Sequence, residues 1–242
     1  MRIDSRKNDQ LRNVKLQCGY LKNCPSSVLI EFSNTRVICS ASLIEDIPSW
    51  MKMQKKSGGW LTAEYQMLPF STKERTRREI TSISGRTHEI QRLVGRSLRA
   101  AIDLEKLGAR TIYIDCEVID ADGGTRCASI SGGMVALRLL ILQMLEKKII
   151  EETPLIRNVA AVSVGIIDGK VMLDLCYEED SNADTDMNVV MADDGNFIEI
   201  QSTAEKNPFS REEFNQMLEL AQKGLNEIFR IQNESILKYN PQ

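Results

Sequence analysis

Residues 110–147 read RTIYIDCEVIDADGGTRCASISGGMVALRLLILQMLEK, and this stretch decides the fold. Apolar and polar residues alternate over residues 110–122, which predicts a β-strand. The strand ends at DGGTR (residues 122–126), where two glycines predict a turn. Residues 128–147 are mostly apolar and long enough for a helix. A strand that passes through a glycine turn into an apolar helix is typical of an α/β domain.

Hairpins are predicted on both sides of this stretch. Residues 28–32 and 36–43 are rich in β-formers and are joined by a short polar turn, which predicts one sheet. Residues 160–167 and 170–177 are joined by Asp168-Gly169, and residues 187–192 and 197–202 by a turn at residues 193–196. The second group predicts a second sheet. The Gly58–Tyr65 run leads into an arginine-rich stretch that we expect to be a surface loop, and we expect residues 45–56 to be irregular.

Two further helices follow from apolar spacing. From Ser84, apolar residues recur at intervals of three and four, which predicts a helix ending before Gly108. A capping box over residues 210–213 opens a C-terminal helix. Its predicted buried face contains Phe214, Met217, Leu218, Ala221, Leu225 and Ile228. Hairpins and helices in this order, without repeated βαβ units, predict an α/β fold of the mixed-sheet sandwich type, as a single domain over residues 1–242.

Composition excludes several classes of protein. The longest apolar stretch, residues 134–145, is shorter than the roughly 20 residues that span a bilayer, so we expect a core helix and no membrane partner. The charged start of the chain does not resemble a secretory signal, and we expect a cytoplasmic protein. Six cysteines form no CxxC pair and His88 is the only histidine, which disfavours a zinc site and a Cys/His nucleophile.

Charge is distributed unevenly along the chain. The net charge of −3 excludes a protein coated in positive charge. Basic residues nevertheless concentrate between residues 73 and 99, and carboxylates concentrate between residues 178 and 194. The arginines are Arg75, Arg77, Arg78, Arg86, Arg92, Arg96 and Arg99. The first region suits phosphate and the second suits a metal ion. For most arginines of the helix in this region, a solvated helix face is the better interpretation.

The glycine turn is the first candidate site. Glycines let the backbone approach an anion, and the N–H groups at a helix start point toward it. Thr125 can donate a hydroxyl hydrogen bond, and the guanidinium of Arg126 matches two phosphate oxygens. The spacing is also that of an ordinary turn, and it is not a GxxxxGK[ST] phosphate loop. No GxSxG motif is found either.

The second candidate site is EEDSNADTD, residues 178–186. Hard carboxylate oxygens suit Mg²⁺, although a solvated acidic loop has the same composition. An anion loop and a carboxylate loop in one chain suggest phosphoryl transfer, in which arginine and Mg²⁺ neutralise charge. Spacing alone does not choose among nuclease, phosphatase and nucleotidyltransferase.

Several ordered motifs carry a resemblance to a known family. They are GGWLTAEY (58–65), GRT (85–87), EIQRL (89–93), GRSLRA (95–100), ADGGTR (121–126) and DMNVVM (186–191). Over nearly its whole length the chain resembles the bacterial RNase PH family. The resemblance implies a ribosomal-protein-like β-α-β sandwich and a homohexameric ring, a trimer of dimers. It also implies 3′-to-5′ exoribonuclease activity by phosphorolysis, chiefly on precursor tRNA, with inorganic phosphate as co-substrate and nucleoside 5′-diphosphates as products.

The resemblance also assigns residue roles. Arg86, Gly124, Thr125 and Arg126 match the family's phosphate-binding positions. Asp180 and Asp186 match its essential aspartates and are the expected Mg²⁺ ligands, with Asp186 able to help protonate the leaving 3′-oxygen. Together with Arg126 they form the expected catalytic set. The expected RNA-binding residues are Arg75, Arg78, Arg92, Arg96 and Arg99.

Some positions depart from the family pattern. These are Ser5, Phe70, Cys127, Ser202 and Lys206, and we expect none of them to touch the catalytic set. Phe70 replaces a guanidinium by an apolar ring, which affects RNA binding or subunit contacts. Two alternatives remain: a catalytically silent ring subunit that only binds RNA, disfavoured by Arg126, Asp180 and Asp186, and a hydrolytic metal-dependent nuclease, which would release different products.

Overall fold

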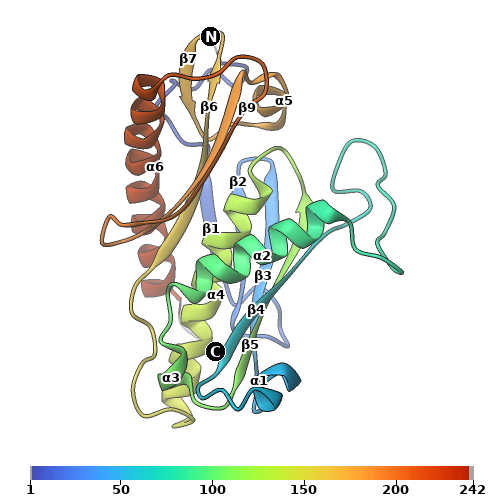
Figure 1. The fold of residues 1–242 in the computed structure, drawn as a ribbon, viewed down its shortest axis with the longest axis vertical. Helices are drawn as coiled ribbons and strands as arrows, with labels where there is room; N and C mark the ends of the chain where they lie inside the picture. Colours follow the sequence, from blue (N-terminus) through green and yellow to red (C-terminus); the bar gives the residue numbers. More distant parts are fainter. Residues whose placement is uncertain (1, 240–242) are drawn as a thin grey trace.

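A computed structural model describes residues 2–239, and within this range the chain forms two β-sheets with helices around and between them (Figure 1). The first sheet has the order β1-β2-β3-β5-β4 and the second β7-β6-β8-β9. The strands are β1 (Val14–Cys18), β2 (Ser27–Phe32), β3 (Thr35–Ile44), β4 (Trp60–Met67), β5 (Thr111–Asp120), β6 (Val159–Ile167), β7 (Lys170–Leu173), β8 (Thr185–Ala192) and β9 (Phe197–Ala204). β4 runs parallel to β5 and the other pairs are antiparallel. The predicted mixed-sheet α/β fold is confirmed.

Helix α4 (Thr125–Glu146) lies between the two sheets, against β2, β3 and β5 on one side and β6 on the other (Figure 1). A helix that is apolar on all sides must be covered on all sides, and both sheets supply that cover. By length and composition α4 could cross a membrane, but 78% of its most apolar window is buried inside the fold. The expected core helix is confirmed.

Two long helices complete the layers. Helix α2 (Gly85–Arg99) packs on β4 and on α4, and Ser84 caps it by accepting the Thr87 N–H at 3.2 Å. Helix α6 (Arg211–Leu237) packs on β6, β7 and the open edge at β1. The predicted capping box is present, because the Ser210 N–H donates to Glu213 Oε2 at 2.7 Å and Ser210 Oγ accepts the Glu213 N–H at 3.2 Å.

Several sequence-based boundaries were wrong for local reasons. The helix predicted to run from Ser84 to Gly108 stops at Arg99, because Asp103 accepts the N–H groups of Glu105 and Lys106 and starts a separate helix α3 (Leu104–Leu107). Residues 45–56 contain a short helix, α1 (Ser49–Met53), which buries Met51. The strand predicted for residues 170–177 ends at Leu173, and residues 177–182 form helix α5 (Tyr177–Asn182).

The core crosses both sheets. One continuous cluster of buried apolar residues contains members of β2, β3, α4, β6 and α6. This continuity is the structural basis for describing residues 2–239 as one unit, and the single domain over 1–242 stays a prediction. Met1 and residues 240–242, the end of the polar C-terminal tail, lie outside the described residues.

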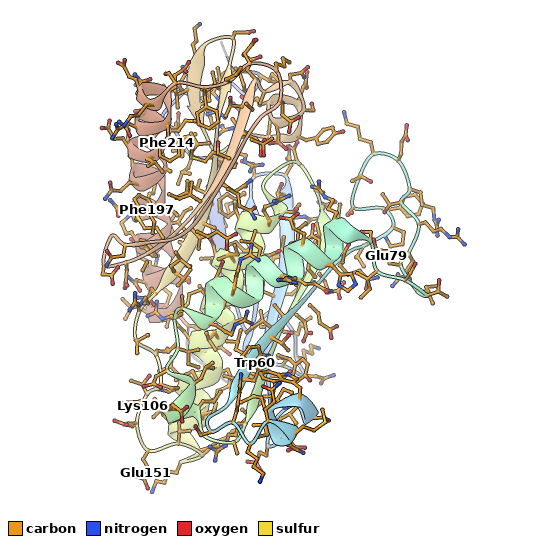
Figure 2. The ribbon with its side chains drawn as sticks, in the orientation of Figure 1. Trp60, Glu79, Lys106, Glu151, Phe197 and Phe214 are labelled. Atoms are coloured by element: carbon orange, nitrogen blue, oxygen red, sulfur yellow. The ribbon has the colours of Figure 1, made fainter. Side chains whose placement is uncertain are left out.

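The segment between β4 and α2 projects from the body of the molecule, as Figure 1 shows. Its residues 73–78 are exposed, which confirms the predicted surface loop. Glu79 ties the segment to the start of α2, since its carboxylate accepts the Ser84 N–H at 3.2 Å and the Thr87 hydroxyl at 3.1 Å (Figure 2). These bonds fix the entry to α2, where Arg86 is located.

Candidate active site

The glycine turn presents backbone N–H groups at the start of α4. Gly123 and Gly124 both have positive φ, +77° and +69°, a conformation that strongly favours glycine. Gly124 is the N-cap of α4 and provides no side-chain cap. Among the described residues, the backbone N–H groups of Gly123 and Gly124 donate to no protein acceptor. A helix start with uncapped N–H groups attracts negative charge.

Thr125 and Arg126 flank this helix start. The Thr125 hydroxyl forms a 2.9 Å hydrogen bond with the hydroxyl of Tyr65, which is buried in β4. Burial raises the pKa of Tyr65, although the Thr125 hydrogen bond and the charges of Arg86 and Arg126 oppose the rise. The charges of both arginines therefore act on the same buried phenol, which is hydrogen-bonded to Thr125.

Arg126 is partly buried between α2 and β9. Its Nη1 donates to Glu89 Oε1 at 3.3 Å and to Gln201 Oε1 at 3.2 Å. Both contacts are at the long end of the hydrogen-bond range, so an incoming anion can compete for the guanidinium. Arg86 is exposed, and within residues 2–239 its guanidinium forms no ion pair or hydrogen bond with the protein.

The predicted carboxylates lie close to the arginines. Asp180 belongs to α5 and Asp186 to β8. Burial raises the pKa of Asp180, while Arg126, Arg86 and Arg12 oppose the rise. Burial also raises the pKa of Asp186, and the negative charges of Asp180 and Glu205 add to the rise. The charges of the two candidate sites therefore act on each other.

A direct contact joins the glycine turn to α5. Asp122 Oδ1 accepts the N–H of Tyr177 at 3.2 Å, and the other carboxylate oxygen accepts from Asn34 at 3.1 Å. A Cβ at Gly123 would lie 2.7 Å from the Leu175 carbonyl oxygen and 2.8 Å from the Tyr177 nitrogen. The turn can approach the backbone before α5 this closely only because it contains glycine.

The two aspartates fit a Mg²⁺ ion. Magnesium is usually held by one or two carboxylates, with water and substrate phosphate completing the octahedron. Among the described residues no group of three or more His, Cys, Asp or Glu side chains forms a metal cage. Asp180 is exposed and Asp186 is half-buried, and both have raised pKa values, so a cation between them would be stabilising; phosphate and RNA would supply the remaining oxygen ligands.

The arginines assigned to RNA binding lie in different settings. Arg75 and Arg78 are exposed in the projecting segment, and Arg92 is exposed on α2. Arg96 pairs with Glu199 of β9. The Arg99 guanidinium donates to the Leu61 carbonyl oxygen at 2.9 Å and stacks 4.6 Å above the Trp60 ring. Arg92, Arg96 and Arg99 line a shallow groove between α2 and β4.

The sequence did not identify the residues that support this site. Glu89 and Gln201 accept hydrogen bonds from Arg126, and Tyr65 is hydrogen-bonded to Thr125. Arg12 donates to the Asp122 carbonyl oxygen at the glycine turn. Tyr65 and Glu89 were within the quoted motifs, but their spacing gave no role. Arg12 had no signal, because a single arginine before a strand does not indicate burial.

The departures from the family pattern are closer to the site than expected. The Ser202 hydroxyl donates to the backbone carbonyl of Asp186 at 3.3 Å, so the expectation that no departure touches the catalytic set was wrong. Lys206 Nζ pairs with Asp184 at 3.2 Å. Register explains both contacts, because β8 and β9 are antiparallel and Ser202 lies opposite Met187. Cys127 is buried, which raises its pKa to about 12, and Phe70 is exposed on the projecting segment.

Comparison with known proteins agrees with the geometry. Residues 10–142 match the model of the 3′ exoribonuclease family, domain 1, and residues 158–224 match domain 2 of the same family. Ribonuclease PH of Corynebacterium glutamicum is 52% identical over 238 residues, covering 97% of this chain and 96% of that protein.

Solved structures share the fold. A chain of the Archaeoglobus fulgidus exosome with RNA bound to the active site superposes with a TM-score of 0.79 at 21% identity, covering 95% of this chain and 91% of that one. A chain of an archaeal exosome core gives a TM-score of 0.73 at 21% identity, with the same coverage. From the two family matches and the identity to a curated relative, we conclude that the chain belongs to the RNase PH family of 3′ exoribonucleases.

Proposed function

We propose that the chain is an active phosphorolytic 3′-to-5′ exoribonuclease that trims precursor tRNA and other RNA. The observation that carries the proposal is the meeting of two groups of opposite charge. The glycine turn contacts the first residue of α5, the helix of Asp180, and Arg126 contacts Gln201 of β9, the strand paired with β8, which contains Asp186. Uncapped N–H groups lie at the start of α4, next to Arg126. The arginines and N–H groups suit an anionic reactant, and the aspartates suit a cation.

Each residue has a role in this reaction. Arg86, the Gly124 N–H, Thr125 and Arg126 bind inorganic phosphate and hold one of its oxygens toward the last phosphodiester of the RNA. That oxygen attacks phosphorus, and the bond from phosphorus to the 3′-oxygen of the preceding nucleotide breaks. A nucleoside 5′-diphosphate leaves, and the shortened RNA ends in a 3′-hydroxyl. Phosphate is already anionic at neutral pH, so no histidine or serine base is required.

The aspartates serve the cation and the leaving group. Asp180 and Asp186 would hold Mg²⁺, which when bound neutralises charge on the reacting phosphate groups. From the family resemblance we infer that Asp186 can also help to protonate the leaving 3′-oxygen. Asp180→Asn and Asp186→Asn should each lose turnover yet still bind RNA. Retained activity in both variants would show that Asp180 and Asp186 do not hold the metal ion.

The nucleophile decides between this function and a hydrolytic nuclease. A 3′-extended tRNA labelled at its last nucleotide is incubated with Mg²⁺, with and without phosphate. Without phosphate the RNA should persist, and with phosphate the label should appear as nucleoside diphosphate. Excess diphosphate should drive the reverse addition. Monophosphate released at an unchanged rate without phosphate would identify a hydrolase, and no release under any condition would identify a silent RNA-binding subunit.

We further propose that the chain works in the cytoplasm as a single-domain protomer of a homohexameric ring. The projecting segment supports a role in assembly or in RNA binding, because its arginines are exposed and too polar for a core. Sedimentation at micromolar concentration should give a hexamer. A fully active monomer would contradict the ring.

A further inference from the structure

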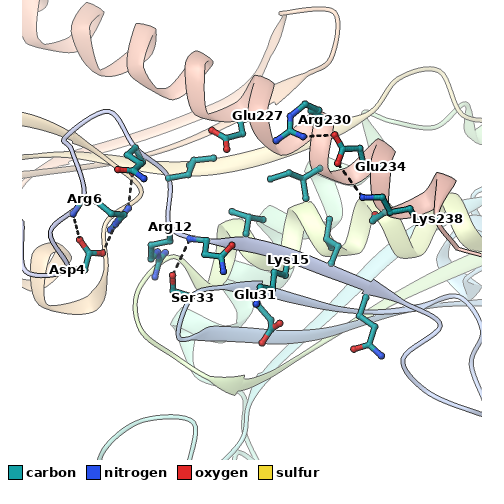
Figure 3. A pocket seen from close by; sticks show the side chains of 18 residues that line it. Asp4, Arg6, Arg12, Lys15, Glu31, Ser33, Glu227, Arg230, Glu234 and Lys238 are labelled. Carbon is teal, nitrogen blue, oxygen red and sulfur yellow. Dashed lines mark hydrogen bonds and ion pairs between the residues drawn. The ribbon is translucent and has the colours of Figure 1, made fainter.

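Arg12 lies where the N-terminal segment enters β1 (Figure 3), and its guanidinium contacts the glycine turn. Its Nη1 donates to the Asp122 carbonyl oxygen at 2.6 Å, and its Nη2 donates to the Gly123 carbonyl oxygen at 3.3 Å. Thr35, at the start of β3, also donates to the Gly123 carbonyl oxygen, at 2.7 Å. The carbonyl groups of two successive peptides therefore face Arg12 and Thr35.

The direction of these carbonyl groups also determines where the N–H groups of the same peptides point. In a planar trans peptide the C=O and the N–H point in opposite directions, and no described peptide bond is cis. Holding the carbonyls of Asp122 and Gly123 toward Arg12 thus turns the N–H groups of Gly123 and Gly124 away from it. These are the two N–H groups that find no protein acceptor.

Arg12 is rigidly held. The Asp174 carboxylate accepts hydrogen bonds from the Arg12 Nε at 3.1 Å, from the Arg12 Nη2 at 2.7 Å and from the Arg12 backbone N–H at 2.8 Å. Arg12 is 3% exposed and Asp174 1% exposed. With a contact to Thr35 Oγ1 at 3.4 Å, the guanidinium forms five hydrogen bonds, as many as it has N–H groups. Lysine, with three donors on one nitrogen, cannot reproduce this arrangement.

The space behind the turn is also fitted to Arg12. A Cβ at Gly124 would lie 2.9 Å from Arg12 Nη2, and the next atom near it is Ser163 Oγ at 3.9 Å. The guanidinium therefore occupies the position that any other residue at 124 would need. The glycine and the arginine are two parts of one arrangement.

We propose that Arg12, held by Asp174 and assisted by Thr35, is a positioning residue of the phosphate site that turns the Gly123 and Gly124 N–H groups toward inorganic phosphate. The inference rests on the proposed phosphate site. Arg12 does not itself touch phosphate in this arrangement, because the turn lies between them. Its loss should therefore weaken phosphate binding while leaving RNA binding intact.

The test compares Arg12→Lys with Arg2→Lys. Arg2 is similarly buried, at 4% exposure, and pairs with Glu179 at 2.6 Å, but it makes no contact with the glycine turn. Arg12→Lys should raise the KM for phosphate about tenfold or more, with the KM for RNA changed less than twofold. Arg2→Lys should leave the KM for phosphate at the wild-type value. Binding of radiolabelled inorganic phosphate by equilibrium dialysis provides a readout independent of turnover.

Thr35→Val provides a second variant with the ion pair left in place. It removes one of the hydrogen bonds to the Gly123 carbonyl oxygen, and the KM for phosphate should rise by about threefold. This variant decides the question if Arg12→Lys does not fold. A wild-type KM for phosphate in a folded Arg12→Lys and in Thr35→Val, or an equal rise in Arg2→Lys, would overturn the proposal.

Arg126→Ala separates this proposal from the proposed function. If Arg126→Ala weakens phosphate binding and the Arg12 variant does not, the phosphate site stands and the positioning role fails. If Arg126→Ala leaves phosphate binding and degradation unchanged, the phosphate site itself is misassigned, and the Arg12 proposal fails with it.

Discussion

The arginines of this chain fall into two groups with opposite surroundings. Arg2, Arg6 and Arg12 near the N-terminus are largely shielded from solvent and pair with the buried Asp174 and Glu179. The arginines of the projecting segment and the start of α2 are exposed: Arg75, Arg77, Arg78 and Arg86. The first group uses its charge inside the fold, whereas the second leaves its charge available to a ligand.

The difference shows that the number of arginines in a segment does not predict their role. A buried guanidinium must find acceptors for its N–H groups, so it fixes whatever backbone supplies them. Arg2 holds the carbonyls of Leu173 and Asp174, and Arg12 holds those of Asp122 and Gly123. An exposed guanidinium with no protein partner costs the fold little and can bind an anion. Stability and activity should therefore respond to different arginines.

Breaking a buried pair should have the largest effect, and it should be on stability. Arg2→Met leaves Glu179 desolvated without its main partner, since the Arg2–Glu179 pair is 0% and 4% exposed at the side chains. Loss of one partner of a buried pair costs about 3 to 5 kcal/mol, measured as the free energy of unfolding in urea. The double variant Arg2→Met with Glu179→Met should recover much of this loss. A single variant within 1 kcal/mol of wild type would contradict the buried group's structural role.

Removing an exposed arginine should have the opposite profile. Arg86→Ala should reduce the turnover of RNA about 10²- to 10³-fold, the cost of losing one preorganised charge contact to a transition state. Its free energy of unfolding should stay within about 0.5 kcal/mol of wild type. Arg230→Ala is the matched control, because Arg230 is exposed on α6 and pairs with Glu234 away from the site. Equal activity in Arg86→Ala and wild type across a phosphate titration would remove Arg86 from the site.

The same contrast explains what the sequence could predict. Periodicity over residues 110–147 identified β5, the glycine turn and α4, because strand, turn and buried helix each have a local signature. The hairpins at Asp168 and Asp193 were predicted for the same reason. Helix α5 was not, because it is short and mostly polar, and its first residue contacts Asp122 while Glu179 pairs with Arg2. Such an element depends on contacts that are distant in the sequence.

The site shows the same limit. Arg126, Asp180 and Asp186 were predicted from the glycine turn, the acidic run and the family resemblance, and they stay predictions; in the structure the charge of Arg126 acts on both aspartates. Arg12, Tyr65 and Gln201 act on the site through partners at separations of 110, 60 and 75 residues. No local pattern encodes those separations. The residues that shape the site are therefore visible only after folding.

The salt dependence of RNA binding should show whether the exposed arginines of the projecting segment contact RNA. If Arg75 and Arg78 bind RNA phosphates, each alanine variant should reduce the slope of log K against log salt by about 0.7, the value for one contact to a single strand. The free energy of unfolding should not change, since both side chains are exposed. The measurement is the dissociation constant for RNA between about 50 and 200 mM KCl. An unchanged slope in both variants would assign the segment to subunit contacts instead.

Buried and half-buried carboxylates also differ in whether a cation pairs with them. This difference should have the smallest effect on the free energy of unfolding. Burial alone would raise the pKa of Glu179, but the hydrogen bonds from Arg2 and from the Cys176 N–H lower it below its ordinary value. Within residues 2–239, no arginine or lysine pairs with Asp115 of β5. Burial and the charge of Glu64, its register partner on β4, raise the pKa of Asp115, although the Ser40 hydrogen bond opposes the rise.

The sign of the pH dependence follows from that rise. A carboxyl whose pKa is higher in the folded state stabilises the fold below its unfolded pKa, about 3.9 for aspartate, and this stability is lost as pH rises through the folded pKa. Asp115→Asn should therefore be more stable than wild type at pH 7 by about 0.2 to 1 kcal/mol, the cost of like charges on adjacent strands. In urea denaturation the gain should shrink toward pH 4. Asp120→Asn is the control, because Asp120 pairs with Arg36 at 2.5 Å and should show no gain. A gain for Asp115→Asn that is the same at both pH values would show that the charge of Asp115 does not destabilise the fold, and that the absence of an arginine partner has no energetic consequence there.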